Sequence, residues 1–120
     1  MMHHLSKPAA QSFYRKEEVG DRDKFPGVME LIPGQITDEF NFTPCGYSMN
    51  GLCENVYSTI HVTPEAHCSY ASFETNASLP SYKRLLSAVF DIFQPGTVTL
   101  TLFTEAPNPA RSMDLLEIPG

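Results

Sequence analysis

Hydrophobic and polar residues alternate with a period of two along three stretches in the middle of the chain. The first runs from Cys45 to Asn50, the second from Val56 to Thr63 and the third from Ser69 to Thr75. Such alternation, in segments with β-branched and aromatic residues, is typical of half-buried strands. The connections at 51–55 and 64–68 are short. We therefore predict that the three strands form an antiparallel meander.

After this meander the hydrophobic period becomes that of a helix. One face of the predicted helix carries Tyr82, Leu85, Leu86, Val89, Phe90 and Phe93. Pro80 and Ser81 suit its first turn, and Gln94-Pro95-Gly96 ends it. A last strand is predicted from Val98 to Phe103, with Val98, Leu100 and Leu102 pointing inward.

The first forty residues are more polar and predict little regular structure. One short helix is expected from Lys7 to Arg15, with Ser6 as its N-cap and Pro8 in its first turn. The stretches at 20–23 and 32–34 are typical of loop and turn. The meander, helix and last strand together predict an α+β fold, an antiparallel sheet with helices on one face.

The other face of the predicted sheet carries mainly polar side chains. The alternation places there Ser48, Tyr57, Thr59 and His61, with either Tyr70 and Glu74 or their neighbours. If the first hairpin turns at 54–55, Ser48 lies directly opposite His61, with Cβ atoms about 5 Å apart. A hydroxyl beside an imidazole can be a nucleophile and its base, or only a hydrogen-bonded polar pair. The hydrophobic pattern does not distinguish a nucleophile and its base from a hydrogen-bonded polar pair.

Composition and charge narrow the classes of function. The chain has 120 residues, enough for one domain, and its formal net charge is −6. Because no basic stripe exists to neutralise phosphates, we expect no nucleic-acid partner and no membrane partner. No apolar run is long enough to span a bilayer, and the first residues do not resemble a signal peptide. The expected location is the cytoplasm.

The cysteines and the His61–Glu65 spacing predict no metal site. Cys45, Cys53 and Cys68 fit neither a disulfide framework nor a C-x-x-C knuckle. We interpret them as reduced structural thiols rather than as redox or metal groups. Pro64 rules out the helix that would place His61 and Glu65 on one face.

Four motifs in a fixed order are more specific than these patterns. They are LIPG at 31–34, FTPCGYSMNG at 42–51, TIHVTPE at 59–65 and SYASFETN at 69–76. This series resembles the C-terminal half of the eukaryotic S-adenosylmethionine decarboxylases, the pyruvoyl enzymes of spermidine and spermine synthesis. The resemblance extends over 31–103. From this resemblance we expect residues 1–120 to form a single partial domain, with an irregular tail at 104–120.

The resemblance implies an α/β/β/α sandwich of which this chain supplies the second half. Family members cleave their own chain at a serine in a Glu-Ser-Ser segment of the first half, which leaves a pyruvoyl group. This group acts as the electron sink when S-adenosylmethionine loses carbon dioxide. The product is the aminopropyl donor for spermidine and spermine synthesis.

The resemblance also assigns roles to five residues. Ser48 and His61 match the serine and histidine of proenzyme processing, where the histidine takes a proton from an ester intermediate. Phe42 matches a phenylalanine that stacks on the substrate adenine, and Glu65 a glutamate that accepts hydrogen bonds from the ribose hydroxyls. Glu74 matches an acidic residue of the charged network where putrescine activates some members.

No Glu-Ser-Ser segment occurs in the 120 residues, and none of the three cysteines matches the family's catalytic cysteine. We therefore expect the isolated chain to be inactive and to expose an apolar face where the N-terminal half would pack. Two main interpretations stay open: a fragment of a working decarboxylase, or a non-catalytic truncated paralogue that binds or regulates a full-length enzyme. A third, an unrelated small binding module that uses the same sheet, is tested by whether S-adenosylmethionine analogues bind. The retention of Ser48, His61 and Glu65 together favours the first. Homodimerisation is also left open.

Overall fold

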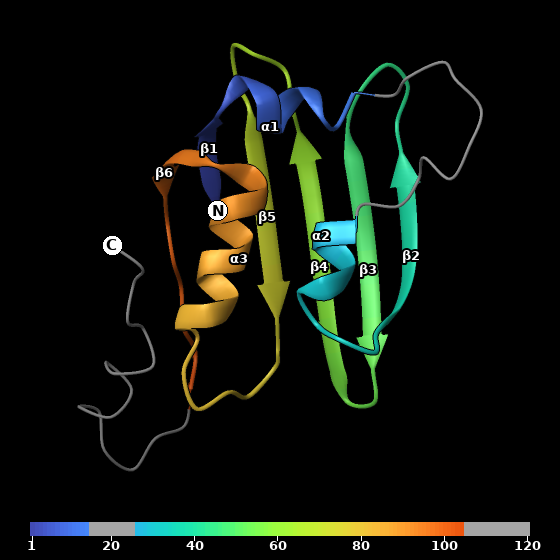
Figure 1. Ribbon diagram of the computed structural model, residues 1–120, viewed down its shortest axis with the longest axis vertical. Coiled ribbons are helices and arrows are strands. Elements are labelled where there is room, and N and C mark those ends of the chain that lie inside the picture. Colours follow the sequence, from blue (N-terminus) through green and yellow to red (C-terminus); the bar gives the residue numbers. More distant parts are fainter. Residues whose placement is uncertain (15–25, 105–120) are drawn as a thin grey trace.

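The computed structural model describes residues 1–14 and 26–104. In chain order its elements are β1 (Met2–Leu5), α1 (Lys7–Gln11), α2 (Pro26–Glu30), β2 (Ile36–Asn41), β3 (Tyr47–Cys53), β4 (Val56–Thr63), β5 (Tyr70–Thr75), α3 (Lys83–Phe93) and β6 (Pro95–Val98). The strands form one six-stranded sheet in the order β2-β3-β4-β5-β1-β6, and all neighbouring pairs are antiparallel. The three helices lie on one face of this sheet (Figure 1). The predicted α+β class is thus confirmed.

The predicted meander is confirmed as β3, β4 and β5. β4 has the predicted bounds, and Cys53 pairs with Val56, so the hairpin turns at the two residues expected. β3 is shifted toward the C-terminus, because Gly46 has a φ of +114° and interrupts the extended backbone. Cys45 instead makes an isolated bridge with Tyr14. β5 begins one residue later than predicted, at Tyr70.

Three elements, β1, α2 and β2, are not predicted by the sequence patterns. β1 has only four residues, too few for a periodic signal, and α2 has five. β2 has an inverted pattern, because its apolar Ile36 and Phe40 are 80% and 58% exposed while Thr37 and Glu39 are half-buried. A half-buried strand is expected to turn its apolar residues toward the helices and its polar residues toward solvent, and β2 does the opposite.

Helix α1 is shorter than predicted and ends at Gln11. Its predicted N-terminus is correct, since the Ser6 hydroxyl accepts a hydrogen bond from the Ala9 amide at 3.2 Å and Pro8 lies in the first turn. After the helix, Tyr14 pairs with Cys45 in an isolated bridge. Arg15 and the predicted loop at 20–23 lie outside the described residues.

Helix α3 begins later than expected, at Lys83, with Pro80 and Ser81 before it. Gln94 ends it in the left-handed conformation, with a φ of +47°. The strand predicted at 98–103 is wrong, because β6 starts immediately after the helix and pairs with β1 from Pro95 to Val98. Beyond β6, Thr99 still exchanges backbone hydrogen bonds with Met1, and residues 100–104 are irregular.

The core lies between the sheet and the helices. Its sheet residues include Tyr47, Met49, Ile60, Val62 and Ala71, and α3 contributes Leu85, Val89 and Phe93. Phe13, just after α1, joins the two layers. Its ring centroid lies 5.5 Å from that of Phe93 and 5.5 Å from that of Tyr47. Burial of each large side chain contributes about 1.5–3 kcal/mol. In the described part of the chain no helix has the length and apolarity needed to cross a membrane.

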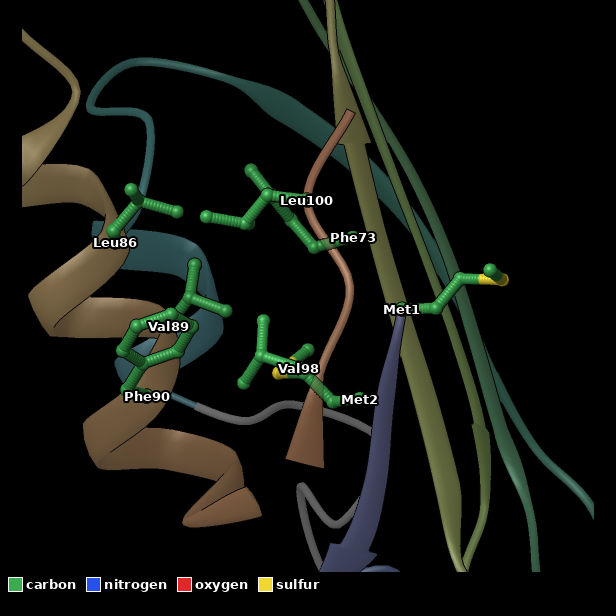
Figure 2. Close-up of a pocket in the computed structure, with 8 residues that line it drawn as sticks. All are labelled: Met1, Met2, Phe73, Leu86, Val89, Phe90, Val98 and Leu100. Atoms are coloured by element: carbon green, nitrogen blue, oxygen red, sulfur yellow. The ribbon is translucent and has the colours of Figure 1, made fainter. Parts of the chain in front are cut away.

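A small cavity of about 50 Å³ lies between α3 and the β1, β5 and β6 side of the sheet (Figure 2). It is lined by Met1, Met2, Phe73, Leu86, Val89, Phe90, Val98 and Leu100. All eight side chains are apolar, so the cavity offers no side-chain group for hydrogen bonding or acid–base chemistry.

The Gln35 side chain connects the end of α2 to the centre of the sheet. Its Oε1 accepts a hydrogen bond from the buried Ser58 hydroxyl at 2.7 Å, and its Nε2 donates to the Val28 carbonyl at 3.4 Å. The amide occupies the space above Gly51, where a Cβ would lie 2.0 Å from Gln35 Oε1 and 2.8 Å from Ser58 Oγ. Gly51 is therefore required for this packing.

We predict that Gly51→Ala lowers the free energy of unfolding by about 1–3 kcal/mol, because the displaced Gln35 leaves the buried Ser58 hydroxyl without its acceptor. Urea unfolding measures the loss. The control is a double-mutant cycle with Gln35→Ala, in which the second substitution should cost less than it does alone. Equal costs in both backgrounds would contradict the proposed packing.

Candidate functional site

The predicted contact between Ser48 and His61 is present on the face away from the helices. The two residues are directly opposite in the β3–β4 register, and Ser48 Oγ lies 3.1 Å from His61 Nδ1. Ser48 is half-buried and His61 is exposed. The hydroxyl therefore orients an imidazole that solvent or a ligand can reach.

The buried face of the same strands fixes this register. Tyr47 pairs with Val62 and Met49 with Ile60, and all four are buried. A slip of one residue would turn these side chains toward solvent, so the core determines that Ser48 and His61 meet. Phe40 on β2 lies opposite Ser48, and Ser72 on β5 lies opposite His61.

Phe42 lies in a tight loop between β2 and β3. The Phe42 amide donates to the Gly46 carbonyl at 3.0 Å, and a Cβ on Gly46 would lie 3.4 Å from Phe42 Cβ. The Phe42 ring packs against Phe40, with centroids 4.8 Å apart. Phe42 is nevertheless 48% exposed, so part of its ring is accessible to a flat ligand.

Glu65 lies in the turn after β4, at the same end of the sheet as the Phe42 loop. Its Oε1 accepts from the Cys45 thiol at 3.4 Å, and its Oε2 from the Cys68 thiol at 3.8 Å. Cys45 belongs to the loop that also carries Phe42. The Cys45–Glu65 contact therefore joins the Phe42 loop to the turn after β4. We call this region the Glu65 end of the sheet.

Glu74 lies on β5 opposite Thr59, on the far side of His61 from the Glu65 end. Its Oε1 accepts a hydrogen bond from the Tyr57 hydroxyl at 2.9 Å. This hydrogen bond, with a smaller contribution from desolvation, raises the pKa of Tyr57 above its ordinary value. The structure thus separates Glu74 from Phe42 and Glu65 by the Ser48–His61 pair.

Sequence reasoning missed the hydrogen-bond partners of both carboxylates. Tyr57 is the diagonal neighbour of Glu74 once Thr59 pairs with Glu74, a separation that an aromatic side chain can bridge. The β4–β5 register would have revealed this contact. Cys45 and Cys68 reach Glu65 from irregular segments, for which periodicity gives no signal.

The structure is therefore an antiparallel α+β domain with a hydroxyl–imidazole pair on its open face and an accessible aromatic ring and a carboxylate at one end. The sequence matches the adenosylmethionine decarboxylase family over residues 1–117, and the chain belongs to that family. It is 46% identical over 111 residues to the S-adenosylmethionine decarboxylase proenzyme of Dictyostelium discoideum, which covers 91% of this chain and 29% of that protein.

Other relatives agree in sequence and in fold. The proenzyme of Xenopus laevis is 43% identical over 115 residues, which cover 93% of this chain and 34% of that protein. The crystal structure of the Trypanosoma brucei AdoMetDC-delta26 monomer superposes with a TM-score of 0.70 and 32% identity, over 78% of this chain and 40% of that one. The chain spans about a third of the length of the curated relatives it matches.

We predict that Glu74→Gln lowers the pKa of Tyr57 toward its ordinary value, because the charged acceptor that favours the protonated phenol is removed. NMR titration of ring-labelled tyrosine measures the shift. Glu65→Gln is the matched control and should leave Tyr57 unchanged. A Tyr57 titration that does not respond to Glu74→Gln would show that the two side chains do not interact in solution.

Proposed function

We propose that this chain provides the processing and substrate-binding face of an S-adenosylmethionine decarboxylase, which removes carbon dioxide from S-adenosylmethionine for spermidine and spermine synthesis. The observation that carries the proposal is the 3.1 Å contact between Ser48 and His61 in a chain of this family. The same two residues match the serine and histidine of proenzyme processing.

The pyruvoyl group of such an enzyme would come from a serine outside this sequence, which has no Glu-Ser-Ser segment. The open face fits a group of this kind, because Ser48, His61 and Ser72 place two hydroxyls and an imidazole in one row, on the face opposite the three described helices (Figure 1). The pyruvoyl carbonyl supplies the electron sink for decarboxylation. The residues of this chain hold the substrate and move protons.

His61 serves as the base in chain cleavage. When its Nδ1–H donates to Ser48 Oγ, the lone pair is on Nε2, and this nitrogen can take a proton from the cleaving chain. Ser48 holds the imidazole in position. A general base of this kind contributes about 10²- to 10⁴-fold in rate.

Phe42 and Glu65 bind the nucleoside part of the substrate at the Glu65 end. The exposed part of the Phe42 ring stacks on the adenine, and the Glu65 carboxylate accepts hydrogen bonds from the ribose hydroxyls. This placement directs the amino-acid part of the substrate toward Ser48 and His61. Glu74, on the other side of that pair, is the site where the ammonium group of putrescine would bind in a putrescine-activated enzyme.

A chimera tests the processing role. In it, this chain replaces the matching third of the Dictyostelium proenzyme. We predict that the chimera cleaves itself into two chains and that His61→Ala slows cleavage about 10²- to 10⁴-fold. Gel electrophoresis of time-course samples measures the rate. His67→Ala, an exposed histidine in a turn, is the matched control and should process normally. Normal processing of the His61 variant would refute the role of His61.

The same chimera tests the stacking role. We predict that Phe42→Ala raises KM for S-adenosylmethionine about two- to twelvefold with little change in kcat, because a stacking contact contributes about 0.5–1.5 kcal/mol. Steady-state release of labelled carbon dioxide gives both constants. Phe103→Ala removes a ring that is 92% exposed beyond β6, at the opposite edge of the sheet, and should leave KM unchanged. An unchanged KM in the Phe42 variant would contradict the assignment.

A further inference from the structure

Two cysteine thiols flank one carboxylate at the Glu65 end of the sheet. The Cys45 thiol lies 3.4 Å from one oxygen of Glu65, and the Cys68 thiol lies 3.8 Å from the other. The two oxygens are bonded to the same carbon, so both thiols contact a single carboxyl group. Neither the family resemblance nor the roles proposed above account for this pair of thiols.

Three separate segments meet here. Tyr14 pairs with Cys45 in an isolated bridge, which holds the Cys45 loop against the chain that follows α1. The Cys68 amide donates to the Glu65 carbonyl at 3.0 Å, which closes the turn that places Cys68 beside Glu65. Cys45 is half-buried and Cys68 is exposed. Cys68 lies in a turn rather than a strand, so it can move without breaking the sheet ladder.

We propose that Cys45 and Cys68 are a redox-active pair that closes into an intramolecular disulfide when the chain meets a low-molecular-weight disulfide such as oxidised glutathione. In the reduced chain both thiols donate to the Glu65 carboxylate. Once the sulfur atoms have bonded, at about 2.05 Å, neither carries a hydrogen that it could donate to the carboxylate. The disulfide and the two thiol hydrogen bonds to Glu65 therefore exclude each other.

The reaction is thiol–disulfide exchange in two steps. The exposed Cys68, as its thiolate, attacks one sulfur of the small disulfide, whose S–S bond breaks, and one small thiolate leaves with the electron pair. The Cys45 thiolate then attacks Cys68 Sγ, the Sγ–Sγ bond forms and the second small thiolate leaves. Two protein thiols are thus oxidised, one small disulfide is reduced to two thiols, and these take up the two protons released.

Glu65 restrains this reaction. Burial raises the pKa of the Cys45 thiol, and the hydrogen bond and negative charge of Glu65 raise it further, while a hydrogen bond with Tyr14 offsets part of this rise. Removal of that charge, as in Glu65→Gln, increases the thiolate fraction of Cys45.

The test treats the reduced 120-residue chain with oxidised glutathione and follows its mass. Chymotrypsin then cuts the unfolded product after Tyr47, which separates Cys45 from Cys53 for peptide mapping without reductant. We expect one disulfide, between Cys45 and Cys68, with Cys53 unlinked. Cys53→Ser should give the same product, and Cys68→Ser should lose it. A disulfide that includes Cys53, a disulfide between chains or a persistent glutathione adduct would overturn the proposal.

The rate of the second step, in which the Cys45 thiolate closes the disulfide, tests the role of Glu65. Glu65→Gln should close faster, by about three- to fourfold for each unit by which the pKa of Cys45 falls, because lower nucleophilicity offsets part of the gain in thiolate. Glu74→Gln is the matched control and should close at the original rate, and circular dichroism checks that both variants are folded. An unchanged or slower rate in Glu65→Gln overturns this part of the proposal. The measurement needs no ligand, so its outcome is independent of whether Glu65 binds ribose.

Discussion

The register between β3 and β4 is the constraint on which the site depends. Tyr47, Met49, Ile60 and Val62 are buried on one face of this hairpin, and their burial allows one alignment of the two strands. The same alignment carries Ser48 and His61 to the other face as direct neighbours. The core therefore selects the pairing of the reactive groups without contacting them.

Local patterns were enough to predict the centre of the molecule. The alternation in β3, β4 and β5 and the period of α3 gave the fold class, and the hairpin turn gave the Ser48–His61 contact. The edges depend on distant partners. β2 turns its apolar residues outward, and the bounds of β6 are set by its pairing with β1, so neither strand is predicted by its own sequence. The position of Cys68 beside Glu65 depends on turn geometry, which has no periodic signal.

The open face of the sheet has a polar centre and an apolar edge. Its large exposed hydrophobic residues gather at the β2–β3 edge, where Ile36 pairs with Leu52, which is 61% exposed. The centre is a polar row around Ser48 and His61. In the two-sheet sandwich that the resemblance implies, the apolar edge would supply packing area. The polar row would then lie between the sheets, where low dielectric strengthens hydrogen bonds and charges.

The short sequence separation of the central pair has a consequence for the order of folding. Ser48 and His61 are 13 positions apart, whereas the contact between Met1 and Thr99 spans 98. The entropy cost of closing a loop grows with its length, and an isolated hairpin forms in about 1–10 μs. The hydroxyl and the imidazole can therefore meet before the outer strands are added. They can also stay together when β1 and β6 open by local fluctuation.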